Sequence, residues 1–164
     1  MRKLLLLFLG ITLMLTSCDK DDCNLARNSG SFEENKAIGV RYNEDAQQDY
    51  YHVEAGENLV FRYSHTAAEC DNAMDDEWGY TLTFEVDKDA TTFRFEGAEL
   101  LAAKGFYQEW GAWVSSNTYP LEGGLIEGSK MADGKWRVKA DVTALPPTVN
   151  GSAKRVTFDT VFEK

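Results

Sequence analysis

Apolar and polar residues alternate along most of the chain after residue 30. In the clearest stretch, from Trp78 to Val86, aromatic and aliphatic side chains alternate with Gly, Thr and Glu. A period of two places the apolar side chains on one face of a β-strand. We therefore predict a half-buried strand there. The same period recurs at Leu59–Tyr63, Phe93–Phe95, Trp136–Val142 and Val156–Phe162.

Shorter extended segments and turns complete this pattern. The shorter segments are Ile38–Tyr42, Asp49–Glu54, Gly105–Ser115 and Gly124–Met131. Asp133-Gly134 predicts a tight hairpin before the Trp136 strand, because glycine adopts the positive φ that such turns require. Glu54–Asn58, which contains Gly56, predicts a chain reversal, and Asn150-Gly151 introduces the last strand.

One segment favours a helix. Ala98–Lys104 consists of helix-forming residues and is followed by Gly105, a residue typical of helix C-termini. A buried strand or a single turn is the alternative.

Roughly eight to ten short strands, each with one polar face, are typical of antiparallel sheets rather than of a buried parallel sheet. We therefore predict an all-β fold, an antiparallel β-sandwich with at most one short helix. A β-barrel is the alternative.

The first residues form an apolar run behind Arg2 and Lys3. The run is shorter than the roughly 20 residues that span a bilayer, which predicts a secretion signal over residues 1–17. Its end, Leu15-Thr16-Ser17-Cys18, resembles the lipobox of bacterial lipoproteins. The resemblance implies that Cys18 becomes the first residue of the mature chain and carries a diacylglycerol anchor with palmitate-type acyl chains. An ordinary signal peptide with a chance cysteine is the alternative.

A charged run follows Cys18, and we predict a flexible, lipidated tether over residues 18–30. Lys20-Asp21-Asp22 resembles the acidic export signal of surface lipoproteins from Bacteroidota-type bacteria. This implies an outer-membrane lipoprotein displayed on the cell surface, with a periplasm-facing position as the alternative. Asp159-Thr160-Val161 resembles the O-glycosylation site of that group, with Thr160 as the acceptor. The hairpin over residues 124–142 resembles those of uncharacterised β-sandwich lipoproteins from the same bacteria.

The charge is strongly acidic, with 17 Lys and Arg against 27 Asp and Glu in 164 residues. Removing residues 1–17 takes away two basic and no acidic side chains, so the net charge falls from −10 to −12. This balance argues against a nucleic-acid partner, which requires cations for its phosphates. The 43% hydrophobic content predicts a folded chain. Residues 31–164 have the length of a single domain.

Two cysteines remain after Cys18. Cys23 and Cys70 lie in a chain addressed to an oxidising compartment, so they are disulfide candidates. Two free thiols are the alternative, because sequence separation does not reveal the distance between Cα atoms.

Candidate chemistry is sparse in the sequence. His52 and His65 are the only histidines and lie outside any catalytic motif, so we interpret them as exposed or hydrogen-bonded strand residues. One loop gathers acidic residues that offer the oxygen ligands Ca²⁺ prefers, with a solvated loop as the alternative. These weak metal candidates are Glu69, Asp71, Asp75, Asp76 and Glu77. We predict no other cofactor.

Aromatic residues crowd one stretch, where Trp110, Trp113 and Tyr119 are ligand-binding candidates. Trp110 and Trp113 fall on opposite faces of an extended segment, so one of them should be exposed. An exposed ring stacks on sugars or anchors a protein partner. Packing of both rings in the core is the alternative.

Together these features predict a non-catalytic, lipid-anchored envelope or cell-surface protein that binds a glycan or a protein partner. The membrane contact would run through the lipid on Cys18. A structural or assembly subunit of an envelope complex is one alternative. A small glycoside hydrolase that uses a pair of carboxylates is another.

Overall fold

The computed structural model describes residues 24–164 except 46, 71–76, 113, 115–116 and 145–151. The described chain is almost entirely β-structure with one short helix, which confirms the predicted class. The elements are β1 (Arg27–Asn43), β2 (Gln48–Thr66), β3 (Trp78–Val86), β4 (Thr92–Glu96), α2 (Glu99–Ala102), β5 (Phe106–Gly111), β6 (Thr118–Lys130), β7 (Trp136–Ala144) and β8 (Lys154–Glu163).

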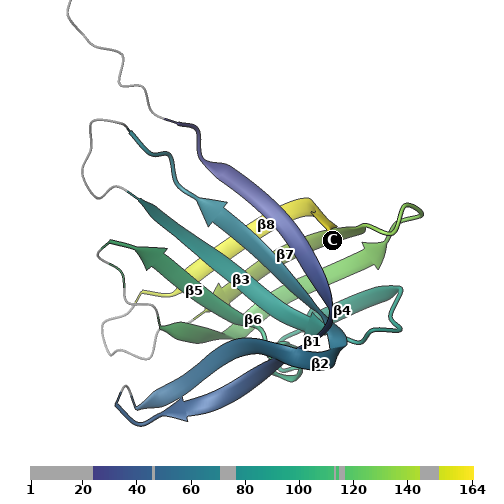
Figure 1. The fold of residues 1–164 in the computed structure, drawn as a ribbon, viewed down its shortest axis with the longest axis horizontal. Coiled ribbons are helices and arrows are strands. Elements are labelled where there is room, and N and C mark those ends of the chain that lie inside the picture. The colour runs from purple at the N-terminus through teal and green to yellow at the C-terminus, as the bar shows by residue number, and fades with distance from the viewer. Residues whose placement is uncertain (1–23, 46, 71–76, 113, 115–116, 145–151) are drawn as a thin grey trace, which may run out of the picture.

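The strands form one sheet in the order β4-β6-β5-β3-β2-β1-β8-β7, and a further pairing of β6 with β7 closes it (Figure 1). Neighbours are antiparallel except β1 and β8, which pair in parallel at Gly30 and Ser31. The parallel pair follows from the strand number, because a closed ring of seven successively antiparallel strands must contain one parallel contact. β4 lies outside this ring and extends the β5 edge of β6.

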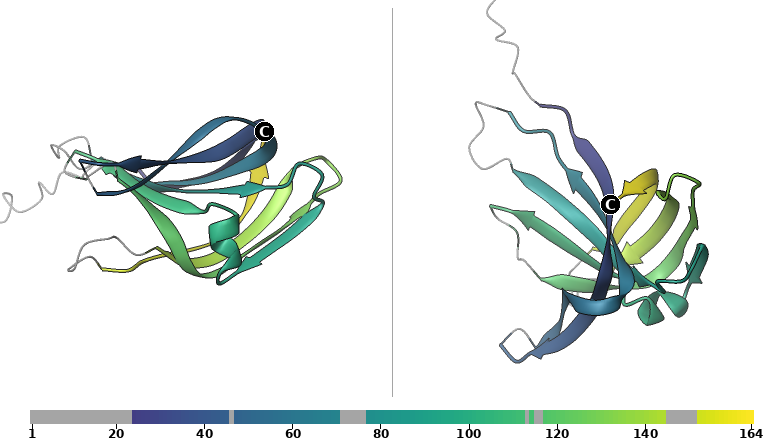
Figure 2. Two further views of the ribbon diagram at one scale, coloured as in Figure 1. Left: turned by 90° about the horizontal axis from the view of Figure 1, so that it is seen from below. Right: turned by 45° about the vertical axis from the view of Figure 1, so that its right-hand side comes forward.

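The closed sheet is flattened into two layers (Figure 2). It therefore combines the two-layer packing of the predicted sandwich with the closure of the alternative fold. Phe61 is fully buried at its centre, and its ring lies 5.2 Å from that of Phe84 and 5.4 Å from that of Trp136. Burial of each such ring contributes about 1.5–3 kcal/mol to folding. The interior is thus an aromatic core that holds the two layers together.

Local predictions agree with the structure at several elements. β3 has the bounds expected from its alternation, and α2 is the one short helix, with Leu100 buried beneath it. The hairpin between β6 and β7 turns at Asp133 and Gly134, where Gly134 has a φ of +84°. The backbone N–H of Met131 donates to the carbonyl of Lys135 at 2.7 Å and closes this turn. The predicted start of the β8 strand at Asn150-Gly151 lies outside the described residues.

The predicted reversal at Glu54–Asn58 is wrong. β2 continues through this segment, and Lys36 of β1 pairs with both Ala55 and Asn58. Gly56 and Glu57 are therefore extra residues on β2, which is the definition of a β-bulge. Glycine and asparagine occur at bulges as well as at turns. The sequence therefore correctly indicated an irregularity at Gly56, but the irregularity is a bulge and not a chain reversal.

Beyond the bulge, the β1–β2 hairpin bends and forms an arm, defined here as residues 36–43 and 48–55. Figure 1 shows it projecting from the rest of the sheet. Ile38 of the arm is buried with Val60 and Phe106 of the sheet, and Tyr51 stacks on Phe106 with ring centroids 5.5 Å apart. The arm thus covers part of the sheet's outer face.

The predicted tether ends earlier than expected. β1 begins at Arg27, which pairs with Thr66, so residues 27–30 belong to the strand. The backbone N–H of Asn24 also donates to the carbonyl of Glu69 at 2.7 Å. The chain is therefore fixed to the sheet from residue 24 onward.

Candidate functional site

Twelve residues of β1, β2, β3 and β5 form three rows across the outer face of these strands. The register of the strands places the members of each row side by side. The first row is Arg27, Thr66, Gly79 and Trp110. The second row is Ser29, Ser64, Thr81 and Gln108. The third row is Ser31, Arg62, Thr83 and Phe106.

These side chains point away from the core because they alternate with buried residues. Along β2, for example, Arg62 is exposed while its neighbours Phe61 and Tyr63 are buried. The arm covers Phe106, and Thr83 is also buried. We call the remaining ten positions the serine–threonine face. They are Arg27, Ser29, Ser31, Arg62, Ser64, Thr66, Gly79, Thr81, Gln108 and Trp110.

The indole of Trp110 packs against this face. A Cβ atom built on Gly79 would approach the indole ring of Trp110 to 2.3 Å, so the ring occupies the space above that glycine. The residue nevertheless remains 39% exposed. One side of the indole rests on the sheet, while part of the ring is left open to solvent. This is the arrangement of an aromatic stacking platform.

The two arginines of the face have no ion-pair partner among the described residues. Arg27 and Arg62 are both exposed. The strand positions of the face include no acidic residue. An acidic protein therefore presents one neutral to basic surface, rich in hydroxyl groups.

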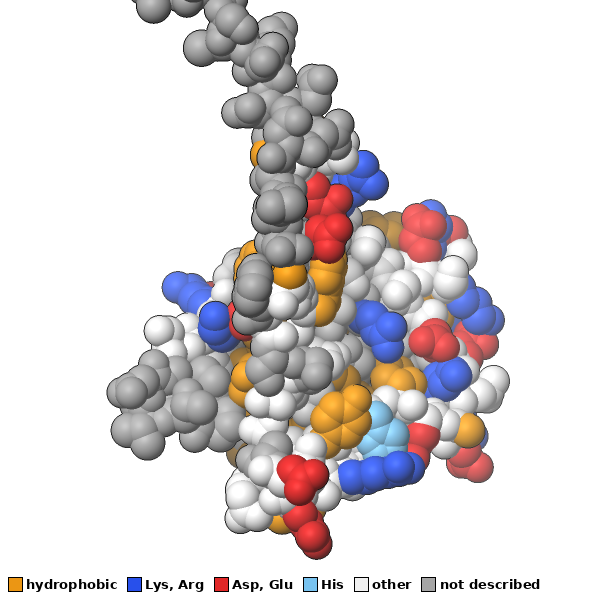
Figure 3. Space-filling model, turned by 60° about the vertical axis from the view of Figure 1, so that its left-hand side comes forward, with side chains coloured by type: hydrophobic (Ala, Val, Ile, Leu, Met, Phe, Trp, Pro, Cys, Tyr) orange, Lys and Arg blue, Asp and Glu red, His pale blue; other side chains and the backbone are white. Residues whose placement is uncertain are grey.

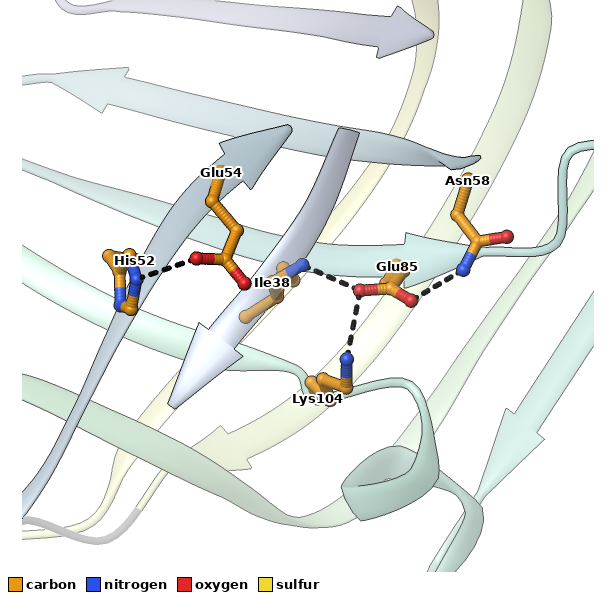
Figure 4. Close-up of polar contacts among 6 residues, drawn as sticks. All are labelled: Ile38, His52, Glu54, Asn58, Glu85 and Lys104. Atoms are coloured by element: carbon orange, nitrogen blue, oxygen red, sulfur yellow. Dashed lines mark hydrogen bonds and ion pairs between the residues drawn. The ribbon is translucent and has the colours of Figure 1, made fainter. Parts of the chain in front are cut away.

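The arm packs over the third-row end of the face, at Phe106, and is held by polar contacts from the sheet. Glu85 accepts a hydrogen bond from the backbone N–H of Ile38 at 2.6 Å and another from the Asn58 amide at 2.6 Å (Figure 4). Lys104 Nζ lies 3.4 Å from the same carboxylate, whose side chain is only 11% exposed. Farther along, the N–H of Tyr51 donates to Thr118 Oγ1 at 2.9 Å.

The outer surface of the arm carries a row of its own. His52 Nε2 lies 3.2 Å from Glu54 Oε2, and the imidazole stacks parallel to the Tyr50 ring. Tyr50 is exposed beside His52. Val40 and Tyr42, which is 58% exposed near the tip, lie on the opposite surface of the arm, the one that includes Ile38. Figure 3 shows hydrophobic, histidine and basic side chains gathered on the lower part of this side of the molecule.

The sequence-predicted ligand residues do not form one site. Trp110 is exposed as expected for one member of its pair, whereas Trp113 lies outside the described residues. Tyr119 pairs with Tyr107 on the inner side of the sheet and packs against the core. Trp110 and Tyr119 therefore lie on opposite faces.

Several tyrosines line the interior near the same end of the sheet. Burial raises the pKa of Tyr63 to about 12, and Tyr63 also hydrogen-bonds Tyr80. Burial likewise raises the pKa of Tyr107, whose hydroxyl donates to Glu109 at 2.7 Å. Glu109 also pairs with Lys154 at 2.9 Å. These polar groups therefore form hydrogen bonds and ion pairs with one another within the interior.

The carboxylates of Glu85 and Glu109 are nearly buried but do not face each other. Glu85 points to the outer face and Glu109 to the inner one, because each alternates with residues of the opposite orientation. Both also accept hydrogen bonds from neighbouring side chains. They therefore do not make the pair across a cleft that glycoside hydrolysis requires.

The acidic metal candidates are only partly described. Glu69 is half-buried and Glu77 is exposed, whereas Asp71, Asp75 and Asp76 lie outside the described residues. Across the part of the chain that the structure describes, no three carboxylate, histidine or cysteine side chains gather as a metal site would require.

The remaining candidates are placed as follows. Cys70 is disulfide-bonded, and its partner lies outside the described residues. Thr160 is half-buried on β8 and lies on the same inward face of the strand as buried Phe158 and Phe162. Cys18 and Cys23 lie outside the described residues. His52 and His65 are hydrogen-bonded strand residues, as predicted, because His65 Nδ1 lies 2.7 Å from Asn28 Oδ1.

The opposite outer face offers a contrasting arrangement. A depression of about 360 Å³ there is lined by Glu127, Arg137 and Lys139 among others. Arg137 and Lys139 both pair with Asp159, at 2.9 and 3.7 Å, so these cations are already engaged. We therefore place the candidate site on the serine–threonine face.

Sequence reasoning missed the two arginines of this face. Arg27 falls within the predicted tether, and Arg62 is one of many polar residues between apolar strand positions. Alternation predicts that Arg62 points outward. Only the strand register brings it onto one face with Trp110.

Comparison of the chain with family models, curated proteins and solved structures gives no match. Among the described residues, no helix has the length and apolar character needed to cross a membrane.

Proposed function

We propose that this protein is a non-catalytic, lipid-anchored envelope protein, displayed on the cell surface, that binds a glycan on its serine–threonine face. The observation that carries the proposal is the partly exposed indole of Trp110, which packs over Gly79. Carbohydrate rings present C–H faces that stack on such a ring, while their hydroxyls exchange hydrogen bonds with polar side chains.

The surroundings of Trp110 support this proposal. Thr66, Thr81 and Gln108 belong to the same and the adjacent row, and each carries hydroxyl or amide groups that donate and accept hydrogen bonds. The rows lie on rigid, registered strands rather than on loops. A sugar chain laid along them would meet a preformed surface, which lowers the entropic cost of binding.

The proposed anchor is compatible with this position. Cys18 precedes Asn24 by six residues, which span about 20 Å when fully extended. Asn24 is fixed at Glu69, and the first row of the face starts at Arg27, three residues later. The anchor would hold the domain close to the membrane, while the face runs along the strands on the side of the molecule.

The Cys23–Cys70 pairing belongs to the same proposal. The hydrogen bond between Asn24 and Glu69 sets the residue after Cys23 beside the residue before Cys70, and Cys70 is disulfide-bonded. A disulfide at this point would fasten the tether to the sheet. Peptide mapping under non-reducing conditions tests the pairing.

The binding test compares two exposed aromatic residues. The full-length protein in detergent is screened against immobilised polysaccharides together with its Trp110→Ala and Tyr42→Ala variants. We expect saturable binding that Trp110→Ala reduces at least tenfold, because stacking of a sugar ring on the indole supplies much of the affinity. Tyr42→Ala should bind as the wild type does. Absence of binding to every polysaccharide would refute the proposal.

The anchor has a separate test. Metabolic labelling with a palmitate analogue should mark the wild-type protein and should not mark the Cys18→Ser variant. Equal labelling of both proteins would exclude lipidation at Cys18.

A protein partner is the second candidate function, and the arm is the feature that favours it. Tyr42, Tyr50 and Arg41 are exposed around its tip, and tyrosine and arginine are enriched among residues that dominate protein interfaces. Cross-linking in native envelopes distinguishes this function. Tyr42→Ala should abolish a cross-linked species that Trp110→Ala retains.

A further inference from the structure

The serine–threonine face of this strongly acidic protein carries two cations for which the described residues supply no ion-pair partner. Arg27 and Arg62 are exposed on neighbouring strands, and neither forms an ion pair with any described residue. Two acidic residues that border the face are each paired with a lysine. Glu33 pairs with Lys36 at 3.5 Å, and Glu163 pairs with Lys135 at 2.7 Å. The two arginines thus remain available to a ligand.

Because Arg is a fixed cation whose planar guanidinium matches carboxylate and sulfate oxygens, unpaired Arg beside hydroxyl groups indicates an anionic, polyhydroxylated ligand. From these observations we infer that the glycan bound here is acidic, with carboxylate or sulfate groups held by Arg27 and Arg62 and a sugar ring stacked on Trp110. This inference rests on the proposed glycan-binding function and names its substrate class.

The spacing fits an oligosaccharide laid obliquely across the strands. Arg62 lies two strands and four residues away from the position of Trp110. With strands about 4.8 Å apart and about 3.3 Å per residue, the two backbone positions are separated by about 16 Å. The hydroxyls of Ser64 and Thr81 lie between them in the second row. A chain of several sugar units therefore contacts the cation and the platform at once.

Charge also determines which end of the ligand lies over which strands. Glu77, next to the first residue of β3, is exposed near the Trp110 end of the face. The acidic groups of the ligand should therefore lie over β1 and β2, and its less charged end over β5. Glu54 and His52 lie on the outer surface of the arm and do not belong to this face.

A lipid headgroup is the other anionic ligand that the arginines would attract. The face, however, runs along the length of the strands on the side of the molecule, while the tether leaves from the strand ends. The single aromatic ring on it also packs over Gly79 of the sheet. The geometry thus favours a ligand that approaches the side of the domain.

The test measures binding of the full-length protein in detergent to polygalacturonate, chondroitin sulfate and a neutral dextran by calorimetry. The variants are Arg27→Ala, Arg62→Ala and Trp110→Ala. Arg137→Ala, which removes the same charge from the ion-paired face, is the matched control. Thermal unfolding establishes that each variant is folded.

We expect an acidic polysaccharide to bind, with affinity falling as salt is added. Each face variant should weaken binding about tenfold, because a charge-assisted hydrogen bond is lost at either arginine and ring stacking at Trp110. Arg62→Lys should recover only part of the loss, since an ammonium group lacks the planar fork. Arg137→Ala should bind as the wild type does.

Other results overturn the inference in distinguishable ways. Binding of dextran that depends on Trp110 but not on either arginine would refute the acidic ligand and leave the proposed glycan function intact. Equal losses of affinity in Arg62→Ala and Arg137→Ala would show that the polysaccharide responds to the net charge of the protein and not to a specific site. Arginine-dependent binding to phosphatidylglycerol vesicles, without binding to either acidic polysaccharide, would assign the face to a lipid surface. No binding to any polysaccharide would refute both proposals.

Discussion

The two outer faces of the closed sheet use arginine in opposite ways. On β7 and β8, Arg137 hydrogen-bonds Asp159 at 2.9 Å and Arg155 hydrogen-bonds Asp141 at 2.7 Å. On β1 and β2, Arg27 and Arg62 have no ionic partner among the described residues. Cross-strand pairs of opposite charge stabilise a sheet modestly. An arginine without such a pair adds no stabilisation of that kind, so the described ion pairs stabilise the β7–β8 face and not the serine–threonine face.

The arm marks a second difference between the faces. It packs over one end of the serine–threonine face, whereas the β7–β8 surface is covered only by its own ion pairs. A docked hairpin requires an attachment, and Glu85 supplies it through the backbone of Ile38. The serine–threonine face and its arm therefore depend on a nearly buried carboxylate, and the ion-paired face on exposed carboxylates.

The largest expected effect comes from removing that attachment. Glu85→Ala should lower the free energy of unfolding by about 2–4 kcal/mol, because the Ile38 N–H, the Asn58 amide and Lys104 all lose their acceptor. Urea unfolding measures the loss. Glu54→Ala, an exposed glutamate of the same arm, is the control and should change stability by less than about 1 kcal/mol. Equal losses in the two variants would show that Glu85 has no special role.

Gly79→Ala tests the support of the Trp110 platform. The added Cβ would meet the indole at 2.3 Å and the carbonyl oxygen of His65 at 2.4 Å, and a backbone atom cannot yield easily. We expect a loss of about 1–3 kcal/mol, together with a displaced indole that changes the tryptophan emission.

Gly123→Ala on β6 is the matched control for this substitution. A Cβ there meets no heavy atom within 4 Å, so stability and emission should stay as in the wild type. Unchanged emission in Gly79→Ala would contradict the placement of the ring.

Acid pH should weaken the ion pairs of the β7–β8 face. Hydrogen bonds from Arg155 and Arg137 hold the pKa values of Asp141 and Asp159 below their ordinary value. A carboxylate with a lowered folded-state pKa contributes stability above its unfolded pKa of about 4 and loses that contribution as pH falls through the folded value. The combined Asp141→Asn and Asp159→Asn variant should therefore be slightly less stable than the wild type at pH 6. The difference in unfolding midpoint should close at pH 2, and a difference that is constant with pH would refute the coupling.

The smallest expected effect belongs to the unpaired arginines. Arg62→Ala should change the free energy of unfolding by no more than about 0.5 kcal/mol, because no described ion pair is lost. Thermal unfolding at pH 6 measures it. A loss above about 1 kcal/mol would mean that Arg62 has a structural role, and the contrast between the two faces would no longer hold.

Much of the fold was predictable because strand alternation is local. The bounds of β3, the hairpin at Asp133-Gly134 and the single short helix all follow from neighbouring residues. The bulge at Gly56 was misassigned as a reversal, because turns and bulges use the same residue types. Closure of the ring also needs the parallel pairing of β1 with β8, which joins the two ends of the described chain and which no local pattern specifies.

The candidate site was predicted only in part. Alternation predicted that either Trp110 or Trp113 would be exposed, and the structure leaves Trp110 exposed. Tyr119 was grouped with it because the two are close in sequence, but two residues on neighbouring strands share a face only if the register places them so. The register of β5 with β6 sets Tyr119 opposite Tyr107 and therefore inside.

The sequence by itself determined that this chain is an all-β domain and which side of each strand is apolar, because those properties depend on residues two positions apart. It also supplied the N-terminal features on which the proposed anchor rests. Only the tertiary structure decided that Arg27, Arg62 and Trp110 share one face. They come from three strands, and registered backbone hydrogen bonds across four strands bring those strands together. The burial of a common aromatic core fixes that register, since a slip by one residue would turn every apolar side chain toward water.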